Sequence, residues 1–178
     1  MTTTKRHPLR LAAATAAIAL AAASPAAAQG ATAKASFVDH SGAMIGAATL
    51  TDTAEGVLIE VELKGVAPGE HALHIHAVGK CDPAGGFTSA GPHLSHEGEM
   101  HGYLHEKGPH AGDMPNQFVA ADGVLRAHVV DPKVTLADAG ITDADGAAIV
   151  VHAGADDYTS QPAGAAGDRV ACGVIGRP

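Results

Sequence analysis

The feature that most constrains the fold of this chain is a series of short apolar runs, each ended by turn residues. Residues 57–63 read Val-Leu-Ile-Glu-Val-Glu-Leu and alternate apolar with polar side chains at their end, as an antiparallel strand with one buried face should. Glu55-Gly56 and Pro68-Gly69 supply turns on either side of this run. We find no segment after residue 28 with a convincing helical period, so the chain is predicted to be all-β.

About eight such runs are expected to form an antiparallel sandwich or flattened barrel, the usual architecture for short strands without helices. Two long irregular stretches, residues 78–116 and 153–168, interrupt the strands. Stretches of this length are usually functional or disordered, and bound metal could organise them from within. The expected strands are residues 32–39, 43–51, 57–64, 71–77, 117–121, 124–130, 148–152 and 169–175.

The first 28 residues are interpreted as a cleavable export signal. Three basic residues between positions 5 and 10 precede an uncharged Ala/Leu/Ile run at 11–23, and a small-residue cleavage site ends at Ala28. The run is too short and too rich in alanine to favour a membrane-spanning helix of ~20 residues, which leaves an uncleaved anchor as the weaker alternative. Cleavage would leave residues 29–178 as one soluble domain, in the periplasm or elsewhere outside the cytoplasm.

An oxidising compartment gives the two cysteines a specific meaning. Cys81 and Cys172 can form only one disulfide, which would close a long loop and stabilise the fold by ~4–5 kcal/mol at most. A pair of buried, inert thiols is the alternative.

The charge balance excludes several classes of partner. The whole chain has a net charge of -8, and removing Lys5, Arg6 and Arg10 with the signal leaves 8 basic against 19 acidic residues, or -11. Nucleic acid and anionic membranes are therefore not expected partners. With three Phe, two Tyr and no Trp, the chain also lacks the aromatic side chains on which bases stack.

Histidine is the dominant metal-binding residue type, with 12 His against two Cys. His74 and His76 stand two apart in an expected strand, which puts both imidazoles on the same face. His152 ends the penultimate expected strand, where its side chain can return to the same patch. Three or four imidazoles with an open position suit copper.

A second group of candidate ligands lies in the first long irregular stretch. His101, His110 and Asp113 follow the spacing His-x8-His-x2-Asp, and His93 precedes them. Three histidines and a carboxylate suit tetrahedral zinc. Two four-ligand sites need eight donors, whereas the two groups supply seven, so one ligand could be shared. His93 is the best placed to bridge two metals through a deprotonated imidazole, although the count permits a bridge without proving one.

Taken together, five segments resemble the copper,zinc superoxide dismutases. They occur in the order typical of that family, with one cysteine pair in the matching places, and the resemblance covers essentially all of residues 29–178. The segments are GEHALHIH (69–76), SAGPH (89–93), GPHAGD (108–113), VVHAGADD (150–157) and RVACGVIG (169–176).

The resemblance implies a Greek-key β-sandwich and a specific reaction. Superoxide anion would be the substrate, dismutated to oxygen and hydrogen peroxide by copper cycling between two oxidation states, with zinc in a non-redox role. Carried over residue by residue, the copper ligands would be His74, His76, His93 and His152, and the zinc ligands His93, His101, His110 and Asp113.

Four further residues acquire roles from the resemblance. Asp156 would accept N–H hydrogen bonds from one histidine of each site and so fix both tautomers. Arg169 would guide the anion beside the open copper position. Cys81 and Cys172 would tie the long loop to the last strand. Family members outside the cytoplasm occur in different assemblies, so a homodimer is a possible state.

Some positions depart from the family pattern. Gly91-Pro92 stands where Gly-Gly is usual before the bridging histidine, and proline fixes a backbone dihedral and lacks an N–H. Residues 161–164 lack a lysine that is commonly counted among the steering charges. These departures leave the loop shape and the strength of steering open, while the liganding positions are intact.

A non-enzymatic protein that buffers or delivers copper and zinc outside the cytoplasm is the alternative function. Such a protein would need neither Arg169 nor Asp156, and copper(I) storage would favour clusters of Met or Cys. A zinc hydrolase has the wrong number of ligands, because catalytic zinc usually keeps one position for water. His96 and His105 could bind additional metal, and we leave both out of the predicted sites.

Overall fold

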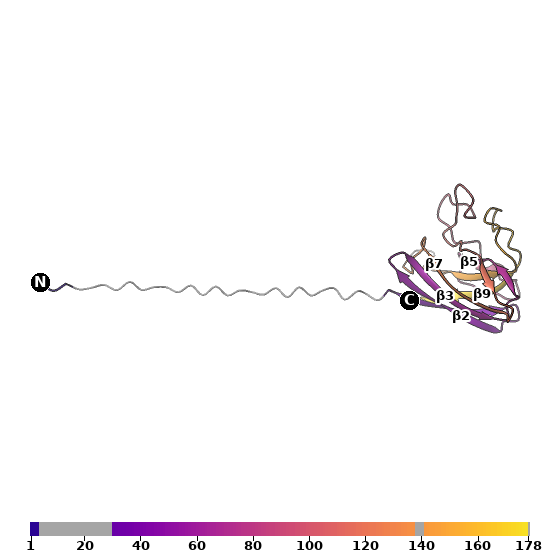
Figure 1. Cartoon of the computed structure of the whole chain (residues 1–178), viewed down its shortest axis with the longest axis horizontal. Helices are drawn as coiled ribbons and strands as arrows, with labels where there is room; N and C mark the ends of the chain where they lie inside the picture. The colour runs from indigo at the N-terminus through magenta and orange to yellow at the C-terminus, as the bar shows by residue number, and fades with distance from the viewer. Residues whose placement is uncertain (4–29, 138–140, 178) are drawn as a thin grey trace.

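Nine antiparallel strands form one sheet with the order β4-β6-β7-β3-β2-β1-β9-β8-β5 (Figure 1). The computed structural model describes residues 1–3, 30–137 and 141–177. Only Ala72 separates β4 from β5, so the two ends of the sheet meet and the sheet forms a nearly closed, flattened barrel, which confirms the predicted fold class. The strands are β1 (Thr32–Asp39), β2 (Met44–Thr53), β3 (Gly56–Lys64), β4 (Gly69–His71), β5 (Leu73–His76), β6 (Gln117–Val119), β7 (Val124–Asp131), β8 (Ala148–His152) and β9 (Arg169–Ile175), with one 3₁₀ turn, η1 (Thr88–Ala90).

The alternation seen in β3 is the reason that this segment forms a strand with one buried face. Val57, Ile59, Val61 and Leu63 are at most 4% exposed, whereas the glutamates between them point outward. The expected bounds of β1, β8 and β9 are confirmed, and β6 and β7 form the expected hairpin.

The expected strand 71–77 is divided, because the chain changes partners at Ala72. His71 in β4 pairs with Gln117 of β6, whereas β5 pairs with β8. Between them the N–H of Ala72 donates to Gly154 O (2.9 Å), and Ala72 O accepts from the N–H of His152 (2.9 Å). The loop after β8 is thereby attached at the point where the sheet closes.

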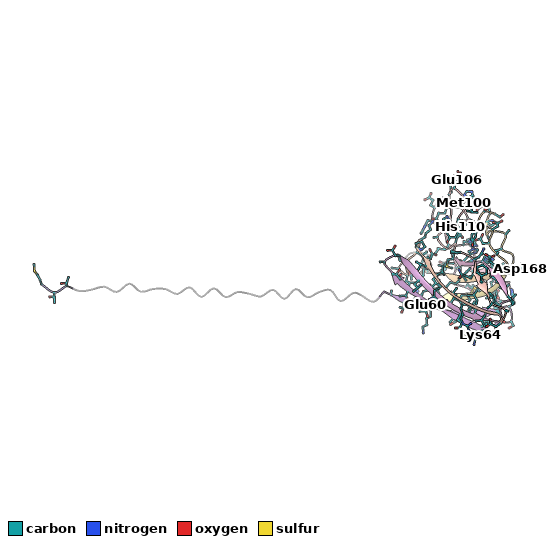
Figure 2. The ribbon with its side chains drawn as sticks, in the orientation of Figure 1. Glu60, Lys64, Met100, Glu106, His110 and Asp168 are labelled. Carbon is teal, nitrogen blue, oxygen red and sulfur yellow. A yellow bond between two sulfur atoms is a disulfide. The ribbon has the colours of Figure 1, made fainter. Side chains whose placement is uncertain are left out.

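The two long loops lie together at one end of the barrel (Figure 1). Figure 2 shows Met100 and Glu106 far out on the first of these loops and His110 nearer the barrel, with Glu60 and Lys64 on the opposite side of the molecule. Hydrogen bonds join the loops, among them the main-chain N–H of His101 to Gln161 Oε1 (3.0 Å). Residues far apart in the sequence therefore meet between the loops and the barrel.

The disulfide Cys81–Cys172 ties the first loop to β9 across 91 positions of sequence, with a Cα–Cα distance of 5.7 Å. The expected pairing is confirmed, and the alternative of two buried thiols is wrong. The expected export signal, residues 1–28, lies outside the described residues apart from positions 1–3. Within the described parts of the chain, no helix is long and apolar enough to span a membrane.

Candidate metal centre

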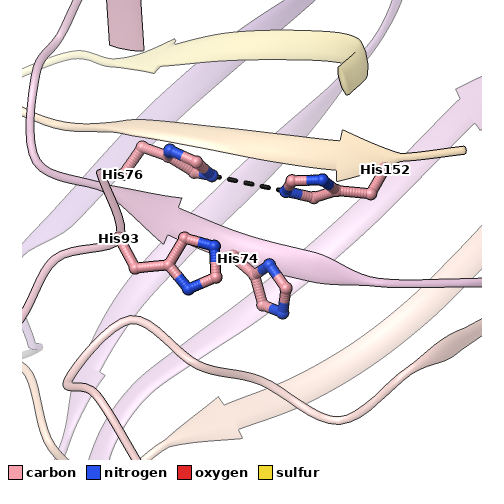
Figure 3. Close-up of side chains that lie close together, drawn as sticks. All are labelled: His74, His76, His93 and His152. Atoms are coloured by element: carbon pink, nitrogen blue, oxygen red, sulfur yellow. Dashed lines mark hydrogen bonds between the residues drawn. The ribbon is translucent and has the colours of Figure 1, made fainter. Parts of the chain in front are cut away.

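The first histidine group is built on the paired strands β5 and β8. His74 and His76 come from β5, His152 ends β8, and His93 comes from the loop beside β5, where it forms an isolated bridge with His76. All four are at most 4% exposed, and each offers a ligand atom within 4.8 Å of the others. Figure 3 shows the rings converging, with His76 Nε2 facing His152 Nε2 at 3.4 Å.

Three of these histidines use one ring nitrogen to donate a hydrogen bond, which leaves the other nitrogen unprotonated and free to bind a metal. This pattern fixes the tautomer of each neutral ring before any metal is present. The bonds are His74 Nε2 to Asp156 Oδ2 (2.9 Å), His76 Nδ1 to Gly91 O (2.9 Å) and His152 Nδ1 to Gly167 O (3.3 Å).

Burial keeps three rings of the first group neutral, those of His74, His76 and His152. Removal from water lowers the pKa of His74 to about 4, although its hydrogen bond to Asp156 acts in the opposite direction. The same cause lowers the pKa of His76 to about 2 and that of His152 to about 3. At neutral pH these imidazoles therefore present lone pairs, as metal ligation requires.

The second group surrounds Asp113, which forms an isolated bridge with His74 of β5. Asp113 Oδ1 lies 2.7 Å from His93 Nδ1, and Oδ2 lies 3.0 Å from His101 Nδ1. His110 Nδ1 lies 3.5 Å from Oδ1. Main-chain N–H groups of Gly102 and His110 donate to Oδ2 and hold the carboxylate in place.

The charges of the second group follow from its contacts. Burial acts to raise the pKa of Asp113, but the close rings of His101 and His93 hold it well below its ordinary value. Burial acts to lower the pKa of His101, but contacts with Asp113 and Asp156 raise it to about 9. The His101 ring therefore lies between two carboxylates, 3.0 Å from an oxygen of each.

Unpartnered nitrogens provide the test of whether the two groups suit metal ions. A buried polar atom without a hydrogen bond is costly and rare. Within the described residues, four buried ring nitrogens make no hydrogen bond, and all four belong to the two groups; two of them, on His101 and His110, lie near Asp113 oxygens without hydrogen-bond geometry. The four nitrogens are His74 Nδ1, His93 Nε2, His101 Nδ1 and His110 Nδ1.

His93 belongs to both groups. Its Nδ1 faces Asp113, while its Nε2 is one of the unpartnered nitrogens. Its ring lies 4.1 Å from that of His74 and 5.1 Å from that of His101, measured between centroids. A single imidazole thus lies between the two candidate sites.

Asp156 connects the two groups from the outer side. Its Oδ2 accepts from His74 Nε2 (2.9 Å) and its Oδ1 from His101 Nε2 (3.0 Å), and the residue is 3% exposed. Burial acts to raise the pKa of Asp156, but these two bonds hold it below its ordinary value. Asn116 fixes its main chain through two hydrogen bonds, to Asp156 N and O.

Arg169 begins β9 opposite His152 in the β8–β9 register. Its guanidinium donates to Phe87 O and to Gly91 O, both at 2.7 Å. Partial burial lowers the pKa of Arg169, but an arginine side chain remains cationic. A fixed positive charge therefore stands beside the first group, close enough to depress the pKa of His76 and His152.

The other histidines that the structure describes lie outside both groups. His71 bridges His152 O (2.7 Å) and Ala67 O (2.8 Å), which is a structural role. His96 is 58% exposed and lies 3.4 Å from a carboxylate oxygen of Glu99, and His105 Nδ1 accepts a bond from the N–H of Lys107. No local pattern indicates that Asn116 supports Asp156, because the two residues lie 40 positions apart in the sequence.

Comparison with known proteins yields one family. The family described as Copper/zinc superoxide dismutase (SODC) matches residues 44–175. A relative named Superoxide dismutase [Cu-Zn], from Caulobacter vibrioides, is 48% identical over 135 residues, which cover 73% of this chain and 77% of that protein. Superoxide dismutase [Cu-Zn] 2 from Aquifex aeolicus is 46% identical over 147 residues, covering 80% and 85%.

Solved structures lead to the same family. A crystal structure of a SOD-like protein from Bacillus subtilis matches with a TM-score of 0.75 and 33% identity, covering 79% of this chain and 96% of that one. The Cu/Zn superoxide dismutase from Brucella abortus matches with a TM-score of 0.67 and 26% identity, covering 82% and 100%.

Proposed function

This chain belongs to the copper/zinc superoxide dismutase family and converts superoxide to oxygen and hydrogen peroxide. On this basis we propose which of its residues bind copper and which bind zinc. The observation that carries the proposal is the set of four unpartnered ring nitrogens, shared between two groups that meet at His93. Copper is assigned to His74, His76, His93 and His152, and zinc to His93, His101, His110 and Asp113.

Copper, when bound, supplies the one-electron chemistry in which one superoxide gives an electron and the next takes one. The protein's own contribution is to orient the ligands and to manage protons. Asp156 holds the protons on His74 Nε2 and His101 Nε2, so both rings present Nδ1 to the metals. His93 Nδ1 faces Asp113, so His93 Nε2 is the ring nitrogen on the side of the proposed copper ligands, and it would hold a proton for the peroxide product.

Arg169 guides the substrate. Superoxide is an anion, and residues 29–178 carry a net charge of -11, so the overall field repels it. Charges farther away than a Debye length of ~8 Å are largely screened at physiological salt, whereas the guanidinium is anchored next to the copper ligands. The local positive charge therefore decides whether the anion reaches the copper.

His152→Ala tests the assignment, with His128→Ala as a matched control because His128 is an exposed histidine on β7. We expect His152→Ala to lose copper and dismutation activity while retaining zinc. We expect His128→Ala to retain copper, zinc and activity. Metal analysis beside a superoxide-dismutation assay of fully loaded, copper-free and zinc-free forms gives the answer. Undiminished copper and activity in His152→Ala, or equal activity in all three metal forms, would overturn the assignment.

Residues 1–28 are proposed to be an export signal, and residues 29–178 to act outside the cytoplasm, in the periplasm. The disulfide supports this location, since disulfides persist mainly in oxidising compartments. N-terminal sequencing of the exported protein should begin at Gln29. An intact Met1 on the exported protein would contradict cleavage.

A homodimer is the assembly we propose. Leu104 is 74% exposed and Phe118 is 71% exposed, and large apolar side chains on a surface often mark a site that another subunit covers. Light scattering should give twice the mass of one chain, and Phe118→Ser should shift the mass towards that of the monomer. A native protein that remains monomeric at high concentration would contradict the proposal.

A further inference from the structure

Gly164, in the loop after β8, packs directly on the hydrogen bond between Asp156 and His101. A Cβ added to this glycine would overlap Asp156 Oδ1 and would lie 2.7 Å from His101 Nε2, the two atoms that form that bond. Real Cβ atoms essentially never approach other heavy atoms within 3.0 Å. A side chain at position 164 must therefore displace the carboxylate or the ring.

The backbone of Gly164 has little freedom to withdraw. Its φ of +67° lies in the left-handed region that favours glycine. Its N–H donates to Ser160 O (2.7 Å), and its carbonyl accepts from the N–H of Asp157 (2.9 Å). The turn from Asp157 to Gly164 is closed by these bonds, so the glycine is held against the Asp156 carboxylate.

Gln161, in the same turn, holds the main chain of His101. The N–H of His101 donates to Gln161 Oε1 (3.0 Å), and Gln161 Nε2 donates to His101 O (2.8 Å). One side-chain amide thus bonds both main-chain polar groups of His101, as a neighbouring strand would. Gln161 Nε2 also donates to Thr159 O (3.1 Å), which fixes the amide within its own loop.

We propose that Gln161 and Gly164 are positioning residues that hold His101 and Asp156 ready for zinc, so that the loop after β8 sets the zinc affinity of a site to which it contributes no ligand. Gln161 fixes where the His101 main chain lies, and Gly164 leaves the space in which the ring reaches Asp156. The inference rests on the proposed assignment of His101 to zinc. Loss of such outer contacts typically lowers metal affinity 10–100-fold, and we expect a loss of about that size.

Gly164→Ala tests the role of the glycine, with Gly65→Ala as its matched control. Gly65 follows β3 and has a φ of +76°, but its added Cβ would meet nothing within 4 Å. Both substitutions impose left-handed strain on alanine, and only the first disturbs the bond between Asp156 and His101. We expect Gly164→Ala to bind zinc about 10–100-fold more weakly, and Gly65→Ala to bind like the native protein.

The measurement is zinc titration of the disulfide-bonded protein against a competing chelator, with the absorption spectrum of cobalt in the zinc site as a second readout. A shifted cobalt spectrum in Gly164→Ala alone would reveal changed ligand geometry, which a general loss of stability does not produce. Equal zinc affinities for the two glycine variants would overturn the role of Gly164.

Gln161→Glu is the companion variant, since glutamate keeps the acceptor for the His101 N–H but replaces the donor to His101 O. We expect several-fold weaker zinc binding, and unchanged binding would remove Gln161 from the inference. His110→Ala separates this inference from the metal assignment. If His110→Ala binds zinc as tightly as the native protein, the assignment itself fails. If it binds weakly while the Gly164 and Gln161 variants are native-like, only the positioning role fails.

Discussion

Asp131, at the end of β7, should make the stability of the fold depend on pH. The residue is 2% exposed, and its Oδ1 accepts the N–H of Lys133 (3.0 Å). In the described structure its buried Oδ2 has no hydrogen-bond partner. Burial raises the pKa of Asp131 to about 6, from an ordinary value of 3.8, with a further contribution from the charges of Asp113 and Glu99.

The size of the effect follows from the two pKa values. The difference of roughly two units corresponds to about 3 kcal/mol. Because the folded-state pKa is the higher one, the contribution of Asp131 to folding is fully present below about pH 4 and is lost as the pH rises through about 6. Above that range the folded protein carries a buried carboxylate that the unfolded chain would keep in water.

Asp131→Asn removes the ionisation while keeping the size and the acceptor for Lys133. The free energy of unfolding of the variant minus that of the native protein should increase by about 3 kcal/mol between about pH 4 and about pH 8, because only the native protein loses stability over this range. Any cost of the unmatched amide donors of the asparagine is the same at both pH values. The change in the stability difference between the two pH values therefore measures the contribution of the Asp131 charge alone. Urea unfolding of the metal-free, disulfide-bonded proteins measures it.

Asp157→Asn serves as the control for this experiment. Asp157 is fully exposed, and a hydrogen bond from Ser160 lowers its pKa, so any trend with pH should have the opposite sign. A stability difference between Asp131→Asn and the native protein that stays flat from about pH 4 to about pH 8 would refute the reasoning.

Three further predictions concern the disulfide, the guiding arginine and the zinc group. Cys81→Ser should lower stability by up to ~4–5 kcal/mol with the strands intact; two free thiols per chain in the unfolded, unreduced native protein would contradict the bridge. Arg169→Glu should strongly lower the second-order rate of superoxide dismutation, and Arg169→Lys should lower it less, with metal content unchanged in both. Added salt should slow the native protein only slightly, because the charge of Asp168 offsets that of Arg169. A native rate in Arg169→Glu would exclude the guiding role. The pKa of His101 is raised to about 9, and a zinc-bound imidazole must be neutral. Zinc binding near neutral pH should therefore release about one proton, and zinc affinity should increase as the pH rises towards 9. Calorimetry in buffers of different ionisation heat measures the proton release, and finding none would contradict the prediction.

The strands could be predicted because the alternation of apolar and polar residues along a strand indicates which side chains are buried. In β3 the apolar residues at positions 57, 59, 61 and 63 are the buried ones, and this period of two can be recognised from consecutive residues alone. The break at Ala72 could not be predicted in this way. It arises because Ala72 bonds to Gly154 and His152, which lie about 80 positions later in the chain, and no local pattern encodes that pairing.

The candidate site was only partly predictable from spacing. His74 and His76 are two apart in a strand, so a shared face follows from strand geometry. Among the loop histidines, spacing alone does not separate His101 from His96. The structure does, since His101 is buried between two carboxylates while the side chain of His96 is 58% exposed.

Polar contacts between the loops are harder still to predict. Gln161 lies 60 residues from His101, and glutamine in a turn has no preferred distant partner. The same holds for Asp131: within the described structure its Oδ2 lacks a hydrogen-bond partner because of how the chain packs, and not because of its neighbours in sequence. Such contacts depend on how two irregular loops fold against each other.

The departure from the family pattern at Gly91-Pro92 is explained by the hydrogen bonds of this segment. Proline cannot donate, but the bond made at position 92 uses its carbonyl, which accepts the N–H of Ala77 (2.9 Å). Gly91 O accepts from both His76 Nδ1 (2.9 Å) and Arg169 Nη2 (2.7 Å). One carbonyl therefore orients both a proposed copper ligand and the proposed guiding cation, and His93 follows two residues after Gly91. We therefore expect a change that moves this segment to shift His76 and Arg169 together, and so to alter copper geometry and substrate guidance at once.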